Sequence, residues 1–255
     1  MTDQPTRPEG AEARAPGLPT VDVNEYGGRR DGERQALNRR LFMQLLVFRV
    51  PGAGADLAGL VTGELSKAGV GSVVYADTMD PRGFGLLTWS DQPADFVERV
   101  RPLFGGVLAA AELRDEMAMI GRTYSIGHEP DLEHVLLRRP VDNVQNEAYP
   151  WHVWYPLRRN GPFNRLDPHE QSIILREHAT IGMAYGQQEL AHDIRLACHG
   201  LDAGDNEFVI GLVGRELHPL SHLVQTMRKT RQTAEFIDKM GPFFVGRVLS
   251  RGAAT

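Results

Sequence analysis

The order of strand and helix patterns, which occurs twice along the chain, is the feature that most restricts its fold. Residues 38–148 carry apolar runs in the order strand, helix, strand, strand, helix, strand, with "EMAMIGRTYSIG" as the closing strand. Residues 149–255 repeat that order with little sequence similarity. This order is that of a ferredoxin-like unit. We therefore predict an α+β fold in which two such units form one barrel-like body.

The second copy has the clearer element boundaries. "WHVWYPLRR" is typical of a strand, and Asp167 with Pro168 predicts a helix start, with Glu170 at the capping-box position. That helix is expected to run to about Leu190. "IRLACHGL" and "EFVIGLVG" predict two strands around the turn "DAGDN", and "GPFFVGRVL" predicts the last strand. The segment between the copies, up to residue 148, is interpreted as a connector.

Composition narrows the function classes. The chain has 255 residues and a formal net charge of −5, which argues against a nucleic-acid partner, since such proteins usually carry a basic face. Cys198 is the single cysteine, so neither an internal disulfide nor a thiolate metal cluster is possible. The chain shows no signal-peptide pattern and no apolar run of membrane-spanning length. We expect a cytoplasmic protein without a membrane partner.

Residues 1–37 differ from the rest of the chain. They are rich in Pro, Gly, Glu and Arg and lack an apolar period, which predicts a mobile or surface-draped arm. Tyr26 is the only aromatic residue in this segment, and we expect it to anchor the arm on the body or on a neighbouring subunit.

A histidine lies on the inward face of the first helix of the second copy. The helical stripe contains Ile174, His178, Ile181, Gly182 and Tyr185. Most isolated histidines on such a face are hydrogen-bonded core residues, and that alternative stays open. The functional alternative is a haem ligand, because a haem iron takes an imidazole beside a flat apolar slot. Gly182 would open the backbone to the ligand, with Ile181 and Tyr185 as walls.

The strand after this helix has one unusually polar face. With a period of two, Asp193, Arg195, Ala197 and His199 share that face, while the opposite face is apolar. Arg195 could stabilise an anion, and Asp193 or His199 could move protons. The alternative is a solvated sheet face with an Asp–Arg pair.

A metal site without haem is a further possibility in the same region. His192, Asp193 and His199 are the ligand types of a two-histidine, one-carboxylate iron site. A strand would point His192 and Asp193 to opposite faces, which disfavours this arrangement.

Tyr155, Arg158 and Arg159 form a third cluster. A strand that ends in two arginines could hold carboxylates such as haem propionates, because guanidinium groups bind them bidentately. Tyr155 could be a redox-active phenol. The alternative is a core tyrosine beside a surface arginine pair.

Motifs of the second copy resemble the chlorite dismutase family, which includes the coproheme decarboxylases of bacterial haem synthesis. The motifs are "VWYPLRR", "LREHATIGMAYG", "HGLD", "MRKT" and "MGPFFVGRV", within residues 150–249; the first half resembles the family by element order only. The resemblance implies duplicated ferredoxin-like units that form a dimeric α/β barrel within one chain. It also implies a homo-oligomer, usually a pentamer, and a haem b or coproheme between helix and sheet.

The resemblance assigns roles to individual residues. His178 falls on the proximal iron ligand, and Tyr155, in "YPL", falls on the tyrosine that coproheme decarboxylases use as a radical site. Arg158 and Arg159 lie where the family has basic residues that meet the propionates. Asp193 departs from the family, because chlorite dismutases have their distal arginine there and many decarboxylases a glutamine.

We therefore expect a haem-dependent oxidoreductase that uses a small oxidant such as peroxide. Coproheme decarboxylation is the best-defined reaction within this hypothesis, and chlorite dismutation is disfavoured by Asp193. Two alternatives stay open: a haem carrier or sensor without turnover, and a haem-free family member that binds another ligand or a metal.

Overall fold

The computed structural model describes residues 18–52 and 56–254. The first half contains β1 (Glu25–Arg30), β2 (Glu33–Leu37), β3 (Phe42–Arg49), α1 (Leu57–Lys67), β4 (Gly71–Asp77), β5 (Gly83–Ser90), the helical turns η1 (Phe96–Val100) and η2 (Arg101–Gly105), β6 (Glu112–Leu113), η3 (Asp115–Met117) and β7 (Met119–Thr123). A connector follows with η4 (His134–Arg138) and α2 (Arg139–Gln145). The second half contains β8 (Trp151–Arg159), α3 (Gly161–Arg165), α4 (Pro168–Gln187), β9 (His192–Ala197), β10 (Phe208–Gly214), α5 (Leu217–Met227), α6 (Arg231–Phe236), β11 (Ile237–Met240) and β12 (Phe244–Gly252).

The main sheet has a ladder that returns to its starting strand. Its strands follow the order β10-β9-β7-β3-β5-β4-β12-β8-β11, with β6 beside β3. Strand β10 also pairs with β8, so the ladder from β10 round to β8 is a closed circuit. Closure leaves these strands without an unpaired edge, which removes a site of unwanted strand addition.

The two halves of the chain use the same strand order. In the first half the order is β7-β3-β5-β4, and in the second it is β12-β8-β10-β9. Counting β3, β4, β5 and β7 as strands one to four of the first half, and β8, β9, β10 and β12 as those of the second, both halves have the order four-one-three-two. The halves join through β4 with β12 and through β7 with β9. The α+β fold predicted from the sequence is confirmed.

The interior of the circuit is filled by apolar side chains from both halves. Met43, Leu45, Trp154, Ile194 and Phe244 are among them, and each is 2% exposed or less. Aromatic rings lie directly on glycines of neighbouring strands. A Cβ at position 211 would stand 2.5 Å from the Trp154 ring, so only glycine fits there.

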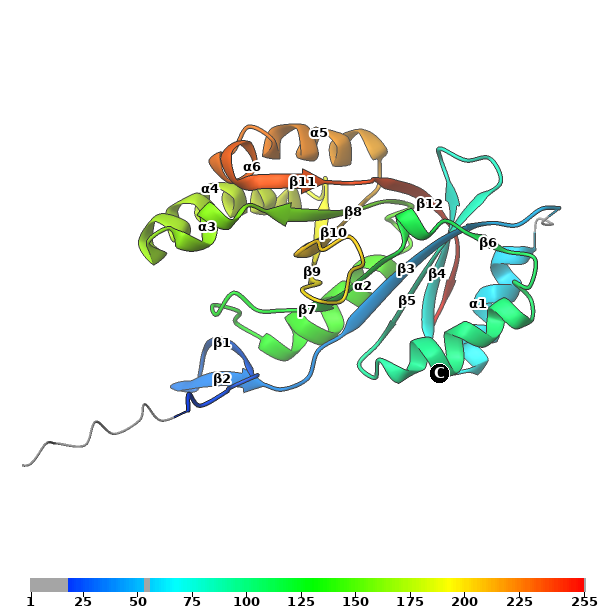
Figure 1. Ribbon diagram of the computed structural model, residues 1–255, viewed down its shortest axis with the longest axis horizontal. Helices are drawn as coiled ribbons and strands as arrows, with labels where there is room; N and C mark the ends of the chain where they lie inside the picture. Colours follow the sequence, from blue (N-terminus) through cyan, green and yellow to red (C-terminus); the bar gives the residue numbers. More distant parts are fainter. Residues whose placement is uncertain (1–17, 53–55, 255) are drawn as a thin grey trace, which may run out of the picture.

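Helices cover the outer face in two separate places (Figure 1). Helix α1 packs on β4 and β12 in the first half, over a second apolar cluster that includes Val61, Leu65 and Leu86. Helices α4 and α5 lie over the second half, where Val153, Leu212 and Leu220 belong to a third cluster. Among the described residues, no helix combines the length and apolar character needed to cross a membrane.

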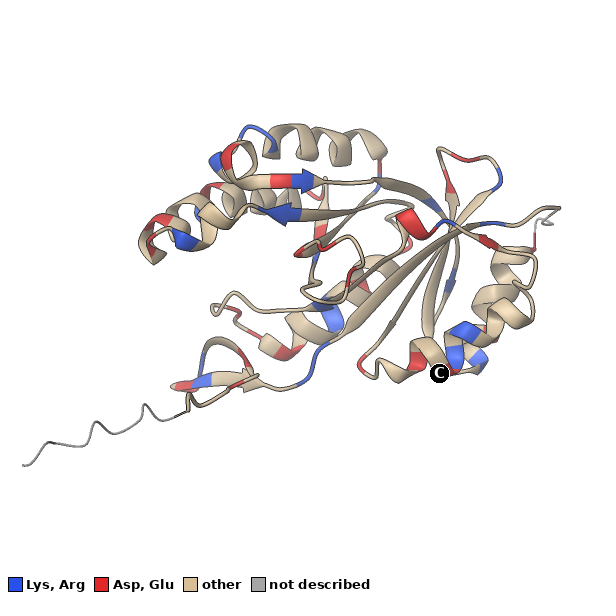
Figure 2. Cartoon of the chain, viewed as in Figure 1, with Lys and Arg blue, Asp and Glu red and all other residues tan. Residues whose placement is uncertain are grey.

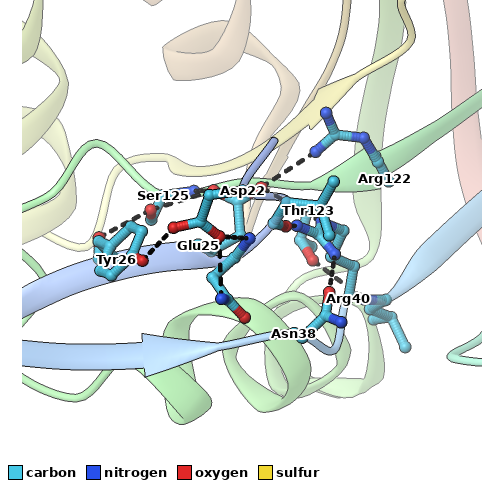
Figure 3. Close-up of polar contacts among 11 residues, drawn as sticks. Asp22, Glu25, Tyr26, Asn38, Arg40, Arg122, Thr123 and Ser125 are labelled. Atoms are coloured by element: carbon cyan, nitrogen blue, oxygen red, sulfur yellow. Dashed lines mark hydrogen bonds and ion pairs between the residues drawn. The ribbon is translucent and has the colours of Figure 1, made fainter. Parts of the chain in front are cut away.

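The described part of the N-terminal arm differs from the prediction. Strands β1 and β2 form an antiparallel hairpin, whereas the sequence predicted no regular element in residues 1–37; residues 1–17 of that arm lie outside the described residues. The hairpin is anchored by the Glu25 carboxylate, which accepts hydrogen bonds from Arg40 (3.2 Å), Arg122 (3.1 Å) and the Ser125 backbone N–H (3.0 Å) (Figure 3). This half-buried acceptor could not be recognised from periodicity.

Tyr26 contributes differently from the expectation. Its ring lies under the guanidinium of Arg34, 4.7 Å from the ring centroid, so the ring packs within the hairpin. Its carbonyl oxygen accepts a hydrogen bond from the Ser125 hydroxyl at 2.8 Å. The contacts of the hairpin with the body therefore include the Tyr26 backbone, Glu25 and Gln35, whose side-chain amide donates to the Glu129 carbonyl oxygen at 3.0 Å.

Candidate functional site

Helix α4 begins where the sequence predicted. The Asp167 carboxylate accepts a hydrogen bond from the His169 backbone N–H at 2.8 Å, and Pro168 occupies the first helical position, where a missing N–H is harmless. Glu170 does not complete a capping box and instead forms an ion pair with Arg231 at 2.9 Å. The cap fixes the phase with which α4 presents its side chains to the sheet.

The predicted stripe of α4 does face the body. Ile174 is 1% exposed, and His178, Ile181 and Tyr185 are half-buried. The rest of the helix is open, because Ile174 is its one buried residue. Most of the stabilisation of a helix comes from its packed face. The side of α4 that carries His178 is therefore held to the sheet by few contacts.

The His178 imidazole has a buried nitrogen without a hydrogen-bond partner. Its Nδ1 is inaccessible to solvent and makes no hydrogen bond with any described residue. Burial lowers the pKa of His178 below its ordinary value, and the positive charge of Arg195 lowers it further. The ring is thus neutral at pH 7 and keeps a lone pair for a ligand. A hydrogen-bonded core histidine, the alternative considered above, would have this nitrogen satisfied.

Strand register places Arg195 and Tyr155 in one row. Ile210 of β10 lies opposite Arg195 of β9 on one side and Tyr155 of β8 on the other. Two strand spacings of about 4.8 Å put their backbones roughly 10 Å apart on the same sheet face. This is the face on which α4 and α5 pack.

Tyr155 is a buried phenol in this row. It is 7% exposed, and its ring stacks on Phe243 with a centroid separation of 4.6 Å. Burial raises the pKa of Tyr155 above its ordinary value, and the charge of Asp193 adds to the effect. Tyr155 therefore stays protonated at physiological pH, as a hydrogen-atom or proton donor must.

Asp193 lies between two arginines. Its Oδ2 is 3.0 Å from Nε of Arg195, and its Oδ1 accepts a hydrogen bond from Nη2 of Arg139 at 2.5 Å. Burial raises the pKa of Asp193, but the charges of Arg195 and Arg139 outweigh it and hold the pKa below the ordinary value. In the sequence, Arg139 can be recognised only as half of the basic pair Arg138-Arg139, which could serve a small anionic ligand. Its place beside Asp193 depends on the packing of α2 against β9.

A small cavity adjoins this charged group. Its volume is about 20 Å³, and it is lined by Thr123, Tyr124, Val135, Arg139, Pro140, Asp193, Ile194 and Arg195. A space of this size holds a water molecule and not a macrocycle. Its polar wall comes from β9 and from the connector helix, so both parts of the chain build it.

Gly182 and Tyr185 lie on the same side of α4 as His178. A Cβ at position 182 would meet only Cε of Met227, at 3.7 Å, so the space beside Gly182 is open. The Tyr185 hydroxyl is hydrogen-bonded to Nδ1 of His222 on α5 at 2.5 Å. Helix α5 carries no Lys, Arg, Asp or Glu (Figure 2).

Arg158 and Arg159 are paired with carboxylates. Arg158 forms ion pairs with Asp238 at 2.9 Å and Asp205 at 3.3 Å. Arg159 donates from Nε to Glu207 at 3.1 Å, and its guanidinium also lies over the Phe208 ring. A ligand carboxylate would have to compete with these partners.

His199 does not join the polar strand face. Strand β9 ends at Ala197, and His199 lies exposed in the following turn, with its ring against the edge of Phe208. The strand predicted to include His199 ends two residues before it, so the two-residue period no longer assigns His199 to the face of Arg195. His192 bonds instead to the hydroxyl of Tyr149 at 2.8 Å. The described residues contain no group of three or more His, Cys, Asp or Glu that could hold a metal ion.

The chain is thus a mixed α+β protein with an imidazole-bearing helix over a polar row of a closed sheet. The family model of chlorite dismutase matches residues 135–249. The resemblance to the chlorite dismutase family predicted from the sequence is confirmed over that segment.

Solved structures extend this similarity to the whole fold. A structure described as a putative chlorite dismutase has 15% identity and a TM-score of 0.67, with 83% of this chain and 96% of that chain covered. A novel haem-binding protein from Thermus thermophilus has 18% identity, a TM-score of 0.62 and coverage of 82% and 91%. Chlorite dismutase from Candidatus Nitrospira defluvii, in complex with imidazole, has 12% identity, a TM-score of 0.64 and coverage of 83% and 92%. No curated protein matches the sequence.

Proposed function

We propose that this chain binds a haem, either haem b or coproheme, with His178 as the iron ligand, and acts as an oxidoreductase on a small oxidant such as peroxide. The observation that carries the proposal is the buried Nδ1 of His178, which has no hydrogen-bond partner among the described residues. The family match over residues 135–249 and the likeness to a haem-binding protein support the same cofactor. The identical strand order in both halves supports a duplicated ferredoxin-like barrel. The proposal includes a homo-oligomer, such as a pentamer, which the family resemblance of the sequence implies.

The residues present fit a haem in chemistry. His178 is neutral and has a ring nitrogen without a hydrogen-bond partner, Gly182 leaves room beside the helix backbone, and α5 carries no Lys, Arg, Asp or Glu. A flat ligand would require α4 to move outward, and the single fully buried residue of this helix would oppose such a movement only weakly. Tyr185 would then contribute an apolar ring, and Arg158 and Arg159 would exchange their carboxylate partners for propionates.

A bound haem would supply redox chemistry at its iron. The residues of this chain would supply charge stabilisation, orientation and a hydrogen-atom donor. Arg195 would stabilise negative charge that develops on the oxidant, since preorganised positive groups act strongly in a partly buried site. Asp193, which its two arginines keep ionised, would orient the Arg195 guanidinium towards the oxidant. Tyr155, kept as a neutral phenol, would serve as a hydrogen-atom donor.

Titration of the purified protein with haem and with coproheme tests the proposal. We expect a shifted Soret band in the unmodified chain that is lost in His178→Ala. His169→Ala is the matched control, because His169 is exposed on the same helix and should leave the band unchanged. An unshifted band in the unmodified chain, or the same band in His178→Ala, would refute haem ligation by His178.

Turnover separates the remaining alternatives. Addition of peroxide to the coproheme complex should remove propionate carboxyl groups, which mass spectrometry detects, if the protein is a decarboxylase. Haem binding without any peroxide-dependent reaction would instead indicate a carrier or sensor. We expect Arg195→Ala to lower the rate about 100-fold, as for loss of one charge-stabilising group in an active site.

A further inference from the structure

Helix α2 of the connector contacts the first residues of β9 through two side chains. Arg139 donates from Nη2 to the Asp193 carboxylate at 2.5 Å, and Asn143 donates to the Asp193 carbonyl oxygen at 3.4 Å. Residues four apart lie on the same face of a helix, so one face of α2 holds both the backbone and the side chain of Asp193. The connector is therefore part of the polar wall.

Because Arg139 binds one oxygen of the Asp193 carboxylate, part of the Arg195 guanidinium is left without a carboxylate partner. The contact of Arg195 with the Asp193 carboxylate is made through Nε, at 3.0 Å. Within residues 18–52 and 56–254, no hydrogen bond of its terminal nitrogens Nη1 and Nη2 is found, and the side chain is 35% exposed. Both nitrogens are donors that a ligand in the adjoining cavity could use.

The charges explain what Arg139 changes. Two guanidinium groups share one carboxylate, so the group carries one net positive charge. Without Arg139 the charge would be zero, and both carboxylate oxygens would be free to pair with Arg195. Guanidinium and carboxylate prefer such a bidentate pair, and it would occupy a terminal nitrogen of Arg195.

We propose that Arg139 is a positioning residue: it holds one oxygen of Asp193 and thereby keeps the terminal nitrogens of Arg195 available to a small anion. Arg139 acts through Asp193 and not on the iron ligand. This role rests on the proposed haem site for its catalytic meaning, but the arrangement of the three side chains exists in the haem-free protein.

The first test uses azide, a small anion, titrated into the haem-loaded protein and followed by the Soret band. Arg139→Gln should weaken azide binding about tenfold, which corresponds to ~1.4 kcal/mol. Arg139→Lys keeps the charge and should recover part of the affinity. The matched control is Arg138→Gln, because Arg138 precedes Arg139 and has only a 3.9 Å contact with Asp131. In an Asp193→Asn background the Arg139→Gln effect should largely disappear.

The second test needs no haem. Phenylglyoxal modifies the terminal nitrogens of arginine, and mass spectrometry of peptides measures the rate at Arg195 alone. We expect Arg195 to react several-fold more slowly in Arg139→Gln than in the unmodified chain or Arg138→Gln. Equal rates of Arg195 modification in Arg139→Gln and Arg138→Gln would overturn the proposal. Equal azide affinities of these two variants in the haem-loaded form would also overturn it. If the unmodified chain binds no haem but Arg195 shows the expected differences in phenylglyoxal reactivity, the proposed haem site is refuted and the proposed role of Arg139 stands.

Discussion

Substitution of Gly182 should change apoprotein stability and haem affinity in opposite directions. Gly182 lies in the interior of α4, one turn after His178, and an added Cβ would meet only Cε of Met227 at 3.7 Å. That distance is ordinary van der Waals contact with the end of a flexible side chain. The haem-free protein can therefore accept a side chain here without strain.

The expected magnitudes follow from this geometry. Glycine in a helix interior is less favourable than alanine by roughly 0.5–1 kcal/mol, so Gly182→Ala should stabilise the haem-free protein by about that amount. Gly182→Leu should add the same helix preference but fill the space that we assign to the macrocycle. Overpacking costs typically 1–3 kcal/mol, which predicts a loss of haem affinity of roughly 5- to 150-fold.

Two measurements on the same variants check these expectations. Urea denaturation of the haem-free protein gives the free energy of unfolding, and Soret titration gives the haem dissociation constant. Ala184→Leu is the matched control, because Ala184 is exposed on the same helix and the substitution adds bulk towards solvent. Unchanged haem affinity in Gly182→Leu, or an equal loss in Ala184→Leu, would show that Gly182 provides no clearance for the cofactor.

Three further expectations concern the framework. Gly211→Ala should destabilise the protein by about 1–3 kcal/mol in urea denaturation, because its Cβ would stand 2.5 Å from the Trp154 ring; Gly59→Ala, with nothing within 4 Å, should stabilise it. Burial and then Arg251 lower the pKa of His152 from 6.5 to about 3, so the stability that its neutral form provides is complete above pH 6.5 and is lost as the pH falls towards 3. Between pH 7 and pH 5 this contribution should decrease by about 2 kcal/mol relative to His152→Gln, and equal pH dependence in both proteins would contradict it. Glu25→Ala should speed amide hydrogen exchange in residues 25–37 through loss of its contacts to Arg122 and Ser125, whereas exposed Glu33→Ala should not.

Local patterns in the sequence determined the elements of the second half and the orientation of α4. The strand "WHVWYPLRR" matches β8, and the cap at Asp167 sets where α4 begins. Both are short-range effects, since a strand or cap depends on neighbouring residues in the chain. The same locality explains why the inward direction of His178 could be predicted from spacing alone.

The pairing of charged groups was decided by the tertiary structure. Asp193 and Arg195 are neighbours on one strand, but Arg139 reaches them from a helix 54 positions earlier. Likewise, Glu25 anchors the hairpin through Arg122, 97 positions away. Such contacts depend on strand register and helix packing, which no local pattern encodes.

The order of the strands in the closed sheet was also decided by the tertiary structure. Its strands could be recognised singly, but their order depends on which strands pair, and β10 meets both β8 and β9 only in the folded chain. Pairing also set where β9 ends, which placed His199 in a turn. The sequence by itself thus determined the fold class and the candidate ligand His178. Long-range packing decided which side chains surround Asp193, because those contacts form only when distant segments are brought together.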